Sequence, residues 1–276
     1  MNDSRPDVLI IGGGIGGLTL ALSLHQAGVS CRVLESAPEI RPLGVGINLL
    51  PHAMRELSEL GLQDRLAARA IETRTLAYYS RHGQPIISDT RGRYAGYDWP
   101  QLSIHRADLH DVLLEAARAR LGDDAVQLDR RCTRIDQDGS GVTVHFDNAA
   151  PLAGKVAIGC DGIHSAVRRQ LFPDEGPPKY SGVNMWRGAV RWPAFLGGNT
   201  MISTGWAAHR ARALMVSAVV PTSSLHRGMR KVKYWPRLPM LVEPAARAAA
   251  VFSTAAGVPM TKSPKCGATE IGRAHV

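Results

Sequence analysis

A glycine-rich turn between a strand and a helix constrains the fold of this chain more than any other feature. Residues 8–11 read VLII, an apolar run typical of a strand buried on both faces. Gly12, Gly14 and Gly17 follow in the pattern G-x-G-x-x-G, and residues 18–24 continue with a helical apolar pattern. The segment therefore predicts the first strand and helix of a βαβ unit.

Each glycine of this motif has a physical role. Gly12 permits a tight exit from the strand, Gly14 lets a pyrophosphate approach the backbone, and Gly17 lets helix and strand pack closely. The pyrophosphate would meet free N–H groups and the positive end of the helix dipole. Ile15 and Gly16, in the first helical turn, are therefore also candidate cofactor-binding residues.

An acid completes the unit. Gly28 can end the helix in the left-handed conformation, and a second strand at residues 31–34 leads to Glu35. A carboxylate there can accept hydrogen bonds from both hydroxyls of an adenosine ribose, and it would repel a 2′-phosphate. The ligand predicted from the residues is FAD or NAD rather than NADP. The alternative is a βαβ unit that binds nothing. It is less favoured because the strand, the helix and the acid all match the dinucleotide-binding pattern.

Length and composition set wider bounds. With 276 residues the chain can hold one large domain or two of ordinary size. No apolar run reaches the roughly 18 residues needed to span a bilayer, and the short polar start leaves no room for a signal peptide. The four cysteines lie far apart without C-x-x-C spacing, which predicts reduced core thiols in a cytoplasmic protein and no metal site.

The net charge of +9 is unevenly distributed. Residues 1–206 hold 22 basic and 22 acidic side chains, whereas residues 207–276 hold 11 basic residues against Glu243 and Glu270 alone. One alternative is therefore a non-enzymatic module whose basic tail binds nucleic acid. We expect no nucleic-acid partner, because the tail lacks interleaved aromatic residues and a helical basic face.

The order of predicted elements indicates an α/β domain with a largely parallel sheet, interrupted by a β-rich excursion. Pro51 can open a helix that Gly61 stops, and residues 75–88 have the pattern of a hairpin. A long amphipathic helix is expected within residues 103–122. Further strands are expected at residues 131–136, 142–146 and 155–159.

Three motifs together resemble the FAD-dependent aromatic-ring hydroxylases, the flavoprotein monooxygenases that include salicylate and p-hydroxybenzoate hydroxylases. They are the unit at 12–35, SIHRADL at 103–109 and GCDGIHSAVR at 159–168. The finer strings EIRPLGVGIN (39–48) and MWRG (185–188) are most similar to the phenazine-1-carboxylate monooxygenase branch. The likeness covers about residues 5–203.

This resemblance implies an FAD/NAD(P)-binding Rossmann-like domain of the glutathione-reductase type, with an inserted β-rich substrate domain. Residues 1–74 and 101–172 would form the discontinuous FAD-binding domain. Residues 75–100 and 173–206 would form part of the substrate domain, and residues 207–276 a tail foreign to the family. The fold is expected to be incomplete at its C-terminus.

Further cofactor contacts follow from the motifs and the resemblance. Asp161 and Gly162 come directly after a predicted strand, so the Asp161 carboxylate can accept a hydrogen bond from a ribityl or ribose hydroxyl; a simple turn is the alternative. Ser165 can cap the next helix, with Arg168 pairing nearby.

By resemblance, Arg106 reaches the flavin cofactor, where it would meet the pyrophosphate as a bidentate donor. The loop with Val45 and Gly46 can bring its backbone close to the flavin ring. Leu128 would meet the adenine through its backbone, by resemblance. A solvated helix charge is the alternative for Arg106, and a core side chain the alternative for Leu128.

Polar and aromatic residues near these motifs are candidates for the substrate pocket. A β-sheet core position is the alternative for the tryptophans and tyrosines among them, and His52 is expected to be a surface residue rather than a catalytic base. The candidates are Asn48, Tyr97, Trp99, Met185, Trp186 and Arg187.

The resemblance implies that tightly bound FAD performs the chemistry and that the protein supplies no catalytic side chain. NADH would bind transiently and reduce the flavin, and O₂ would form a C4a-hydroperoxide that hydroxylates an aromatic or N-heteroaromatic carboxylate, with or without decarboxylation. The protein would be a monomer or a homodimer. Another FAD-dependent oxidoreductase that uses the same binding half is the alternative.

The resemblance stops near Thr204. The Gly-Asp motif that the family uses later in the chain to hold the flavin is absent, and residues 207–276 follow neither a helical nor a strand period. The tail is therefore predicted to be disordered, and FAD retention to be weak. In one choice of codons the ending EIGRAHV resembles a sequencing-library adapter, which suggests a frameshift with adapter read-through and a truncated, weakly active or inactive product.

Overall fold

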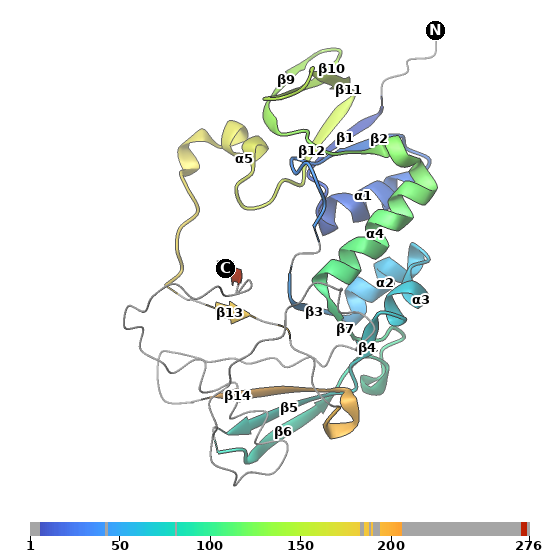
Figure 1. The fold of residues 1–276 in the computed structure, drawn as a ribbon, viewed down its shortest axis with the longest axis vertical. Helices are drawn as coiled ribbons and strands as arrows, with labels where there is room; N and C mark the ends of the chain where they lie inside the picture. Colours follow the sequence, from blue (N-terminus) through green and yellow to red (C-terminus); the bar gives the residue numbers. More distant parts are fainter. Residues whose placement is uncertain are drawn as a thin grey trace. The chain divides into compact units, whose positions relative to one another are not determined.

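The computed structural model describes residues 6–41, 44–80, 82–182, 185–187, 189, 194–205 and 272–274 (Figure 1). The chain divides into two compact units. Unit 1 comprises residues 1–43 and 109–182, and unit 2 comprises residues 44–108 and 183–276.

A four-stranded parallel sheet forms the centre of unit 1, in the order β12-β1-β2-β8. The chain leaves β1 for β2 on one side and later returns to β12 on the other, so β1 lies inside the sheet and is buried along its whole length. This confirms the predicted largely parallel sheet. The strands are β1 (Val8–Ile11), β2 (Cys31–Leu34), β8 (Val126–Gln127) and β12 (Val156–Gly159).

Helix α1 (Ile15–Gln26) packs on β1 and β2 through Leu18, Ala21 and Leu22, all of which are buried. Its last turn is followed by Gly28 with φ +73°, the left-handed end predicted from the sequence. The longest described helix, α4 (Arg106–Leu121), begins directly after the last strand of a unit 2 sheet. Most of its length belongs to unit 1.

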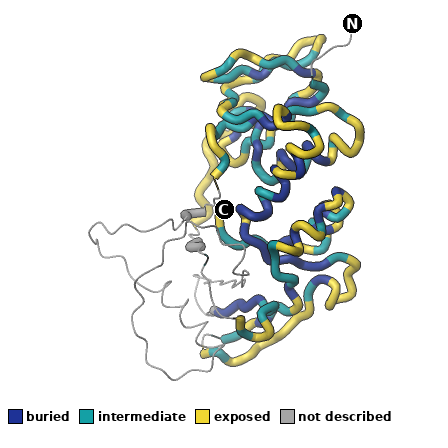
Figure 2. Tube along the Cα trace, turned by 45° about the vertical axis from the view of Figure 1, so that its right-hand side comes forward, coloured by how far each residue is buried: buried dark blue, intermediate teal, exposed yellow. Residues whose placement is uncertain are grey.

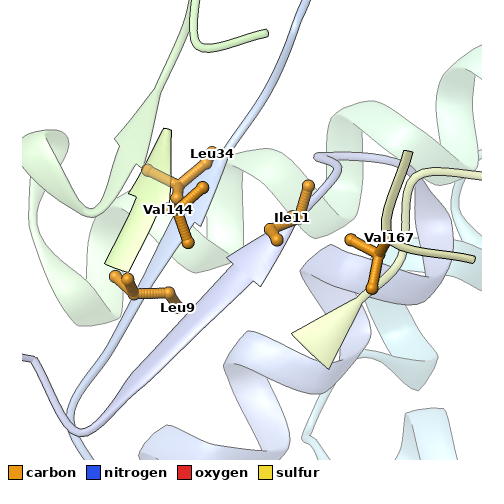
Figure 3. Packing of buried hydrophobic residues seen from close by; sticks show 5 residues of the cluster. All are labelled: Leu9, Ile11, Leu34, Val144 and Val167. Carbon is orange, nitrogen blue, oxygen red and sulfur yellow. The ribbon is translucent and has the colours of Figure 1, made fainter. Parts of the chain in front are cut away.

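A three-stranded antiparallel sheet in the order β11-β10-β9 packs against the parallel sheet. Successive side chains of a strand face opposite ways, so Leu9 and Ile11 join Leu34, Val144 and Val167 in one apolar cluster (Figure 3). Fully burying such a side chain stabilises the fold by about 1.5–3 kcal/mol. The strands are β9 (Cys132–Asp138), β10 (Gly141–Phe146) and β11 (Leu152–Gly154).

The short helix α5 (Ala166–Leu171) follows β12 and packs against β9. The amide of Gln170 accepts a hydrogen bond from the Ile135 N–H at 2.8 Å and donates to the Ile135 carbonyl oxygen at 2.5 Å. Because β9 lies at the edge of its sheet, this side chain takes the place of a neighbouring strand for one residue.

The described part of unit 2 contains two three-stranded sheets and one two-stranded pairing. The antiparallel sheet β3-β7-β4 has a central strand, β7, that is buried throughout, whereas the edge strand β6 of the sheet β14-β5-β6 is exposed throughout (Figure 2). The strands are β3 (Gly46–Leu49), β4 (Ala70–Glu72), β5 (Thr75–Ser80), β6 (Pro85–Thr90), β7 (Leu102–His105) and β14 (Thr200–Gly205). Helices α2 (Pro51–Glu59) and α3 (Gln63–Ala67) lie between β3 and β4 in the chain.

Short 3₁₀ turns complete the described elements, at Gly92–Ala95, Asp123–Ala125, Pro173–Glu175 and Leu196–Gly198. The predicted helix after Pro51 is confirmed, and so is the hairpin, as β5 and β6. Residues 173–182, predicted for the substrate domain, belong to unit 1. The compact units also differ from the predicted domains at residues 44–74 and 101–108. These residues belong to unit 2 because β3, β4 and β7 pair with one another rather than with the parallel sheet.

The tail predicted to be disordered, residues 207–276, lies outside the described residues except at Gly272–Ala274. These three residues form β15, which pairs antiparallel with β13 (Met185–Arg187), so the prediction of disorder does not hold for them.

The described helices include none that combines the length and the apolar character needed to cross a membrane. Cys31, Cys132 and Cys160 are free thiols, as predicted, but each is only partly buried rather than in the core. Cys266 lies outside the described residues.

Candidate functional site

Three parallel strands of unit 1 end at the same level of the sheet. Ile11, the last residue of β1, is in register with Leu34 of β2 and with Gly159 of β12. The residues that follow therefore emerge side by side at the carboxyl edge, where open α/β sheets bind ligands and where β1 marks the reversal of strand order. Gly12, Glu35 and the Cys160–Asp161 pair occupy these positions.

Two glycines of the motif are required by close backbone contacts. Gly12 has φ +108°, and a β-carbon on it would lie 2.4 Å from the Cys160 carbonyl oxygen. A β-carbon on Gly17 would lie 2.0 Å from the Gly12 carbonyl oxygen. The tight strand exit at Gly12 and the close helix packing at Gly17, both predicted from the sequence, are therefore present.

Gly14 differs from these two because it borders open space. It stands at the N-cap of α1 without a side-chain cap, and a β-carbon on it would meet no atom within 4 Å in the described part of the chain. The N–H groups in the first turn of a helix have no partner within the helix. Gly14, Ile15 and Gly16 therefore present a row of backbone donors and leave room for a ligand, which fits a pyrophosphate group.

Glu35 holds the glycine turn from the neighbouring strand end. Its Oε2 accepts a hydrogen bond from the Gly13 N–H at 2.7 Å. Its Oε1 accepts hydrogen bonds from the Ala37 N–H at 2.8 Å and the Ser36 hydroxyl at 3.2 Å. A carboxylate has about four acceptor positions, so one remains for a ligand, and a second becomes free if the Ser36 hydroxyl rotates.

Asp161 lies on the other side of the turn and is engaged in a similar way. Its Oδ1 accepts from the Ser165 hydroxyl at 2.5 Å, and its Oδ2 accepts from the N–H groups of Ala166 at 2.7 Å and Val167 at 3.4 Å. The carboxylate thus caps α5, while Gly162 makes a sharp turn with φ +78°. Ser165 is the N-cap, as predicted, through a hydrogen bond from the Arg168 N–H.

Two thiols lie near Asp161. Burial, followed by the negative charge of Asp161, raises the pKa of Cys132 to about 11, and the same two causes raise the pKa of Cys160. Both groups are therefore neutral thiols near pH 7 and are poor nucleophiles. Among the described residues, no group of three histidine, cysteine or acidic side chains is placed to hold a metal ion.

Leu128 follows β8 at the same carboxyl edge, because Gln127 pairs with Leu34. The chain on either side of it is tied to the Glu35 segment: the Glu35 N–H donates to the Gln127 carbonyl, and the Arg130 N–H donates to the Glu35 carbonyl, both at 2.8 Å. The backbone of Leu128 is thus beside Glu35, whereas its side chain is only partly buried.

The structure adds a residue that the sequence did not indicate. His110 of α4 donates a hydrogen bond from Nε2 to the Gly13 carbonyl oxygen at 2.8 Å. The two residues are 97 positions apart, and no local pattern connects a helical histidine with a glycine turn. Only the packing of α4 within unit 1 brings them together.

Three further candidates meet in unit 2. Gly46 is in register with His105, and the N–H of the next residue, Arg106, donates to the Val45 carbonyl at 2.9 Å. Gly44 has φ +130°, and a β-carbon on it would lie 2.9 Å from the Arg106 β-carbon. Arg106 itself is exposed, so its guanidinium can meet an anion.

Asn48 is oriented by a buried chain of hydroxyl groups. Its Oδ1 accepts from the Ser103 hydroxyl at 2.7 Å, and Ser103 in turn lies 2.7 Å from the Thr73 hydroxyl. A hydroxyl has one proton to donate, so Thr73 donates to Ser103. This leaves the Nδ2 group of Asn48, a donor, as the end that can meet a ligand.

We expect Ser103→Ala to lower the free energy of unfolding by about 1–3 kcal/mol, because it leaves the buried Thr73 hydroxyl and the Asn48 oxygen without their partner. Urea titration followed by circular dichroism measures the change. Ser88→Ala, in the exposed strand β6, is the matched control and should stay within about 0.5 kcal/mol of the unaltered chain. If the two variants unfold at the same urea concentration, the hydrogen bonds of Ser103 do not stabilise the fold.

The other substrate-pocket candidates are not assembled around Asn48 by any described contact. Tyr97 follows the 3₁₀ turn at Gly92–Ala95 and is 59% exposed, and Trp99 is partly buried. The core position weighed as the alternative does not apply to Tyr97. Met185, Trp186 and Arg187 form β13, and their side chains lie outside what the structure describes. His52 is exposed, as predicted.

Comparison with known proteins places these observations in a family. The family model described as "FAD binding domain" matches residues 5–237. This match extends beyond Thr204, where the resemblance was predicted to end. Residues 206–237 themselves lie outside the described residues.

Relatives and solved structures agree with that match. Phenazine 1,6-dicarboxylic acid hydroxylase PhzS of Lysobacter antibioticus is 42% identical over 206 residues, covering 72% of this chain and 51% of the relative. A 3-amino-4-hydroxybenzoate 2-monooxygenase of Streptomyces cremeus is 34% identical, covering 99% of this chain and 62% of the relative. The chain thus spans about half to three fifths of the length of these relatives.

Among solved structures, that of Klebsiella pneumoniae HpxO complexed with FAD and uric acid is similar, with a TM-score of 0.63 and 29% identity. The match covers 72% of this chain and 50% of that chain. A structure of a single-substitution variant of HpxO complexed with FAD has a TM-score of 0.64 and 28% identity, covering 73% of this chain and 52% of that chain.

Proposed function

The chain belongs to the family of FAD binding domains, and from this premise we propose that it serves an FAD-dependent monooxygenase that hydroxylates an aromatic or N-heteroaromatic carboxylate. NADH is the proposed reductant and O₂ the oxidant. The observation that carries the proposal is the placement of Glu35 and Asp161 on either side of the Gly12–Gly13 turn, at one edge of one sheet.

The residues of unit 1 fit the adenosine diphosphate part of FAD. Glu35 would accept from the ribose, the N–H groups of Gly14 and the first turn of α1 would bind the pyrophosphate, and the backbone of Leu128 would meet the adenine. Asp161 and Gly162 would contact the ribityl or ribose hydroxyls with the acceptor position that α5 leaves free.

Unit 2, taken by itself, carries the other cofactor-binding residues that the resemblance implies. Arg106 would pair with a phosphate oxygen, and the backbone of Val45 and Gly46 would approach the flavin ring. When bound, FAD supplies the redox chemistry that transfers one atom of O₂ to the substrate. The protein's own contribution is to bind, to orient the aromatic ring and to exclude water.

Two observations support a carboxylate substrate. The names of both relatives describe aromatic acids, a phenazine dicarboxylic acid and an aminohydroxybenzoate. In addition, the Nδ2 donor of Asn48 is suited to an anionic acceptor. Where the carboxylate is attached to the ring carbon that is hydroxylated, we propose that hydroxylation is accompanied by decarboxylation. We also place the protein in the cytoplasm, as a monomer or a homodimer.

The proposal is tested in two steps on the purified chain. Titration with FAD, followed by quenching of flavin fluorescence, should show saturable binding that gel filtration reverses, in keeping with the predicted weak retention. NADH and O₂ consumption are then measured with a panel of aromatic carboxylates, with the methyl ester of each acid as its matched control.

Coupled consumption of NADH and O₂, stimulated by an acid and not by its ester, is the expected result. Absence of FAD binding would refute the cofactor assignment. NADH oxidation that no member of the panel stimulates would favour the alternative, another FAD-dependent oxidoreductase.

A further inference from the structure

The hydrogen bond between His110 and Gly13 has a consequence for the nucleotide-binding turn. Both polar groups of the Gly13 backbone are bound by side chains from other elements: the N–H by Glu35 at 2.7 Å and the carbonyl by His110 at 2.8 Å. Gly13 is buried between them. We propose that His110 is a positioning residue that aims the Gly14 N–H at a diphosphate oxygen of the bound dinucleotide.

The argument follows from the planarity of the peptide bond. The carbonyl of Gly13 and the N–H of Gly14 belong to one trans peptide unit, so they point in opposite directions. Because His110 holds the carbonyl, the Gly14 N–H points away from α4. Gly14 also borders open space, because a β-carbon built on it would meet no described atom within 4 Å, so a ligand can approach the backbone closely at this position.

The neighbours of His110 are suited to such a role. Leu109 and Leu113 on the same helix are buried and fix the backbone of α4, whereas His110 is only partly buried. A carbonyl oxygen can only accept, so the imidazole must carry its proton on Nε2. A glycine turn has high conformational freedom, and a hydrogen bond that removes the freedom before the ligand arrives increases affinity.

The inference rests on the proposed binding of FAD, and the test compares two variants with the unaltered chain. His110→Leu keeps an apolar side chain of similar bulk without a donor, whereas His110→Gln restores an N–H donor at a similar reach. FAD affinity is measured by fluorescence quenching, and the unfolding transition of each cofactor-free variant by urea titration.

We expect His110→Leu to weaken FAD binding about 5- to 10-fold, the worth of one hydrogen bond, and His110→Gln to stay within about twofold of the unaltered chain. Equal affinity for the leucine variant and the unaltered chain would overturn the inference. Equal losses in both variants would also overturn it, because they would show that the donor is not the cause.

A second measurement does not depend on the cofactor. The nitrogen chemical shifts of labelled histidine rings in the cofactor-free chain, recorded at a pH where the imidazole is neutral, report which nitrogen carries the proton. A proton on Nε2 of His110 is expected, and a proton on Nδ1 would refute the inference. If the unaltered chain fails to bind FAD, the proposed function fails, and this ring measurement alone decides the inference.

Discussion

A chain with Gly17→Ala is expected to lose about 3 kcal/mol or more of its free energy of unfolding, the upper range for overpacking. The added β-carbon would lie 2.0 Å from the Gly12 carbonyl oxygen and 3.3 Å from a side-chain carbon of Ile10. Neither neighbour can move easily, because Gly12 is pressed against Cys160 and Ile10 is fully buried in β1. The helix must therefore move away from the strand, and the turn that presents Gly14 is lost with it.

The matched control lies one residue away. Gly16 is also in the first turn of α1, yet a β-carbon on it would meet no atom within 4 Å in the described part of the chain. Gly16→Ala should therefore raise stability by about 0.5–1 kcal/mol, because alanine loses less backbone entropy in a helix. Urea unfolding of both variants measures the contrast. Indistinguishable transitions for the two variants would show that the close approach of helix and strand is not the cause.

The sequence alone was sufficient to predict the turn, because its constraints are local. The spacing of Gly12, Gly14 and Gly17 encodes a left-handed exit, an open position and a close packing contact within six residues. The helix after Pro51 and the hairpin at β5 and β6 were predictable for the same reason, since a proline at the start and a short polar turn act within a few positions.

What the two acids do within the fold could not be predicted in this way. Their positions after strands predict that Glu35 and Asp161 accept hydrogen bonds from ligand hydroxyls. In the structure each accepts three hydrogen bonds from its own chain: Glu35 from the glycine turn and residues 36–37, and Asp161 from the start of α5. A strand end reveals that an acid lies at the edge, but its partners depend on how the following segment folds back.

Contacts between distant segments were also beyond the sequence patterns. The contact of His110 with Gly13 and the hydroxyl chain from Thr73 to Asn48 each join residues that share no local pattern. The grouping of residues 44–74 with unit 2 depends on the pairing of β3 and β4 with β7. Strand pairing across dozens of residues is decided by tertiary packing, which local periodicity does not record.

The second large effect is expected at Glu35. Replacing Glu35 with glutamine keeps one acceptor oxygen but turns an NH₂ group toward an N–H donor, that of Gly13 or that of Ala37. The same change weakens the acceptor that the ribose would use. Hydrogen bonds to a charged group contribute about 1.5–3 kcal/mol each, so FAD affinity should fall about 10- to 100-fold. Fluorescence titration measures this loss.

Glu39→Gln is the control for net charge, because it removes one negative charge from unit 1, as Glu35→Gln does. The Glu39 side chain is 66% exposed and pairs with Arg41. This substitution should therefore leave FAD affinity unchanged within about twofold. A second probe separates the ribose from the turn. The unaltered chain should bind ADP better than adenosine 2′,5′-bisphosphate, because the Glu35 carboxylate repels a 2′-phosphate, and Glu35→Gln should narrow that difference. If the variant keeps both the FAD affinity and the preference for ADP, then Glu35 only shapes the turn, and the ribose is held elsewhere.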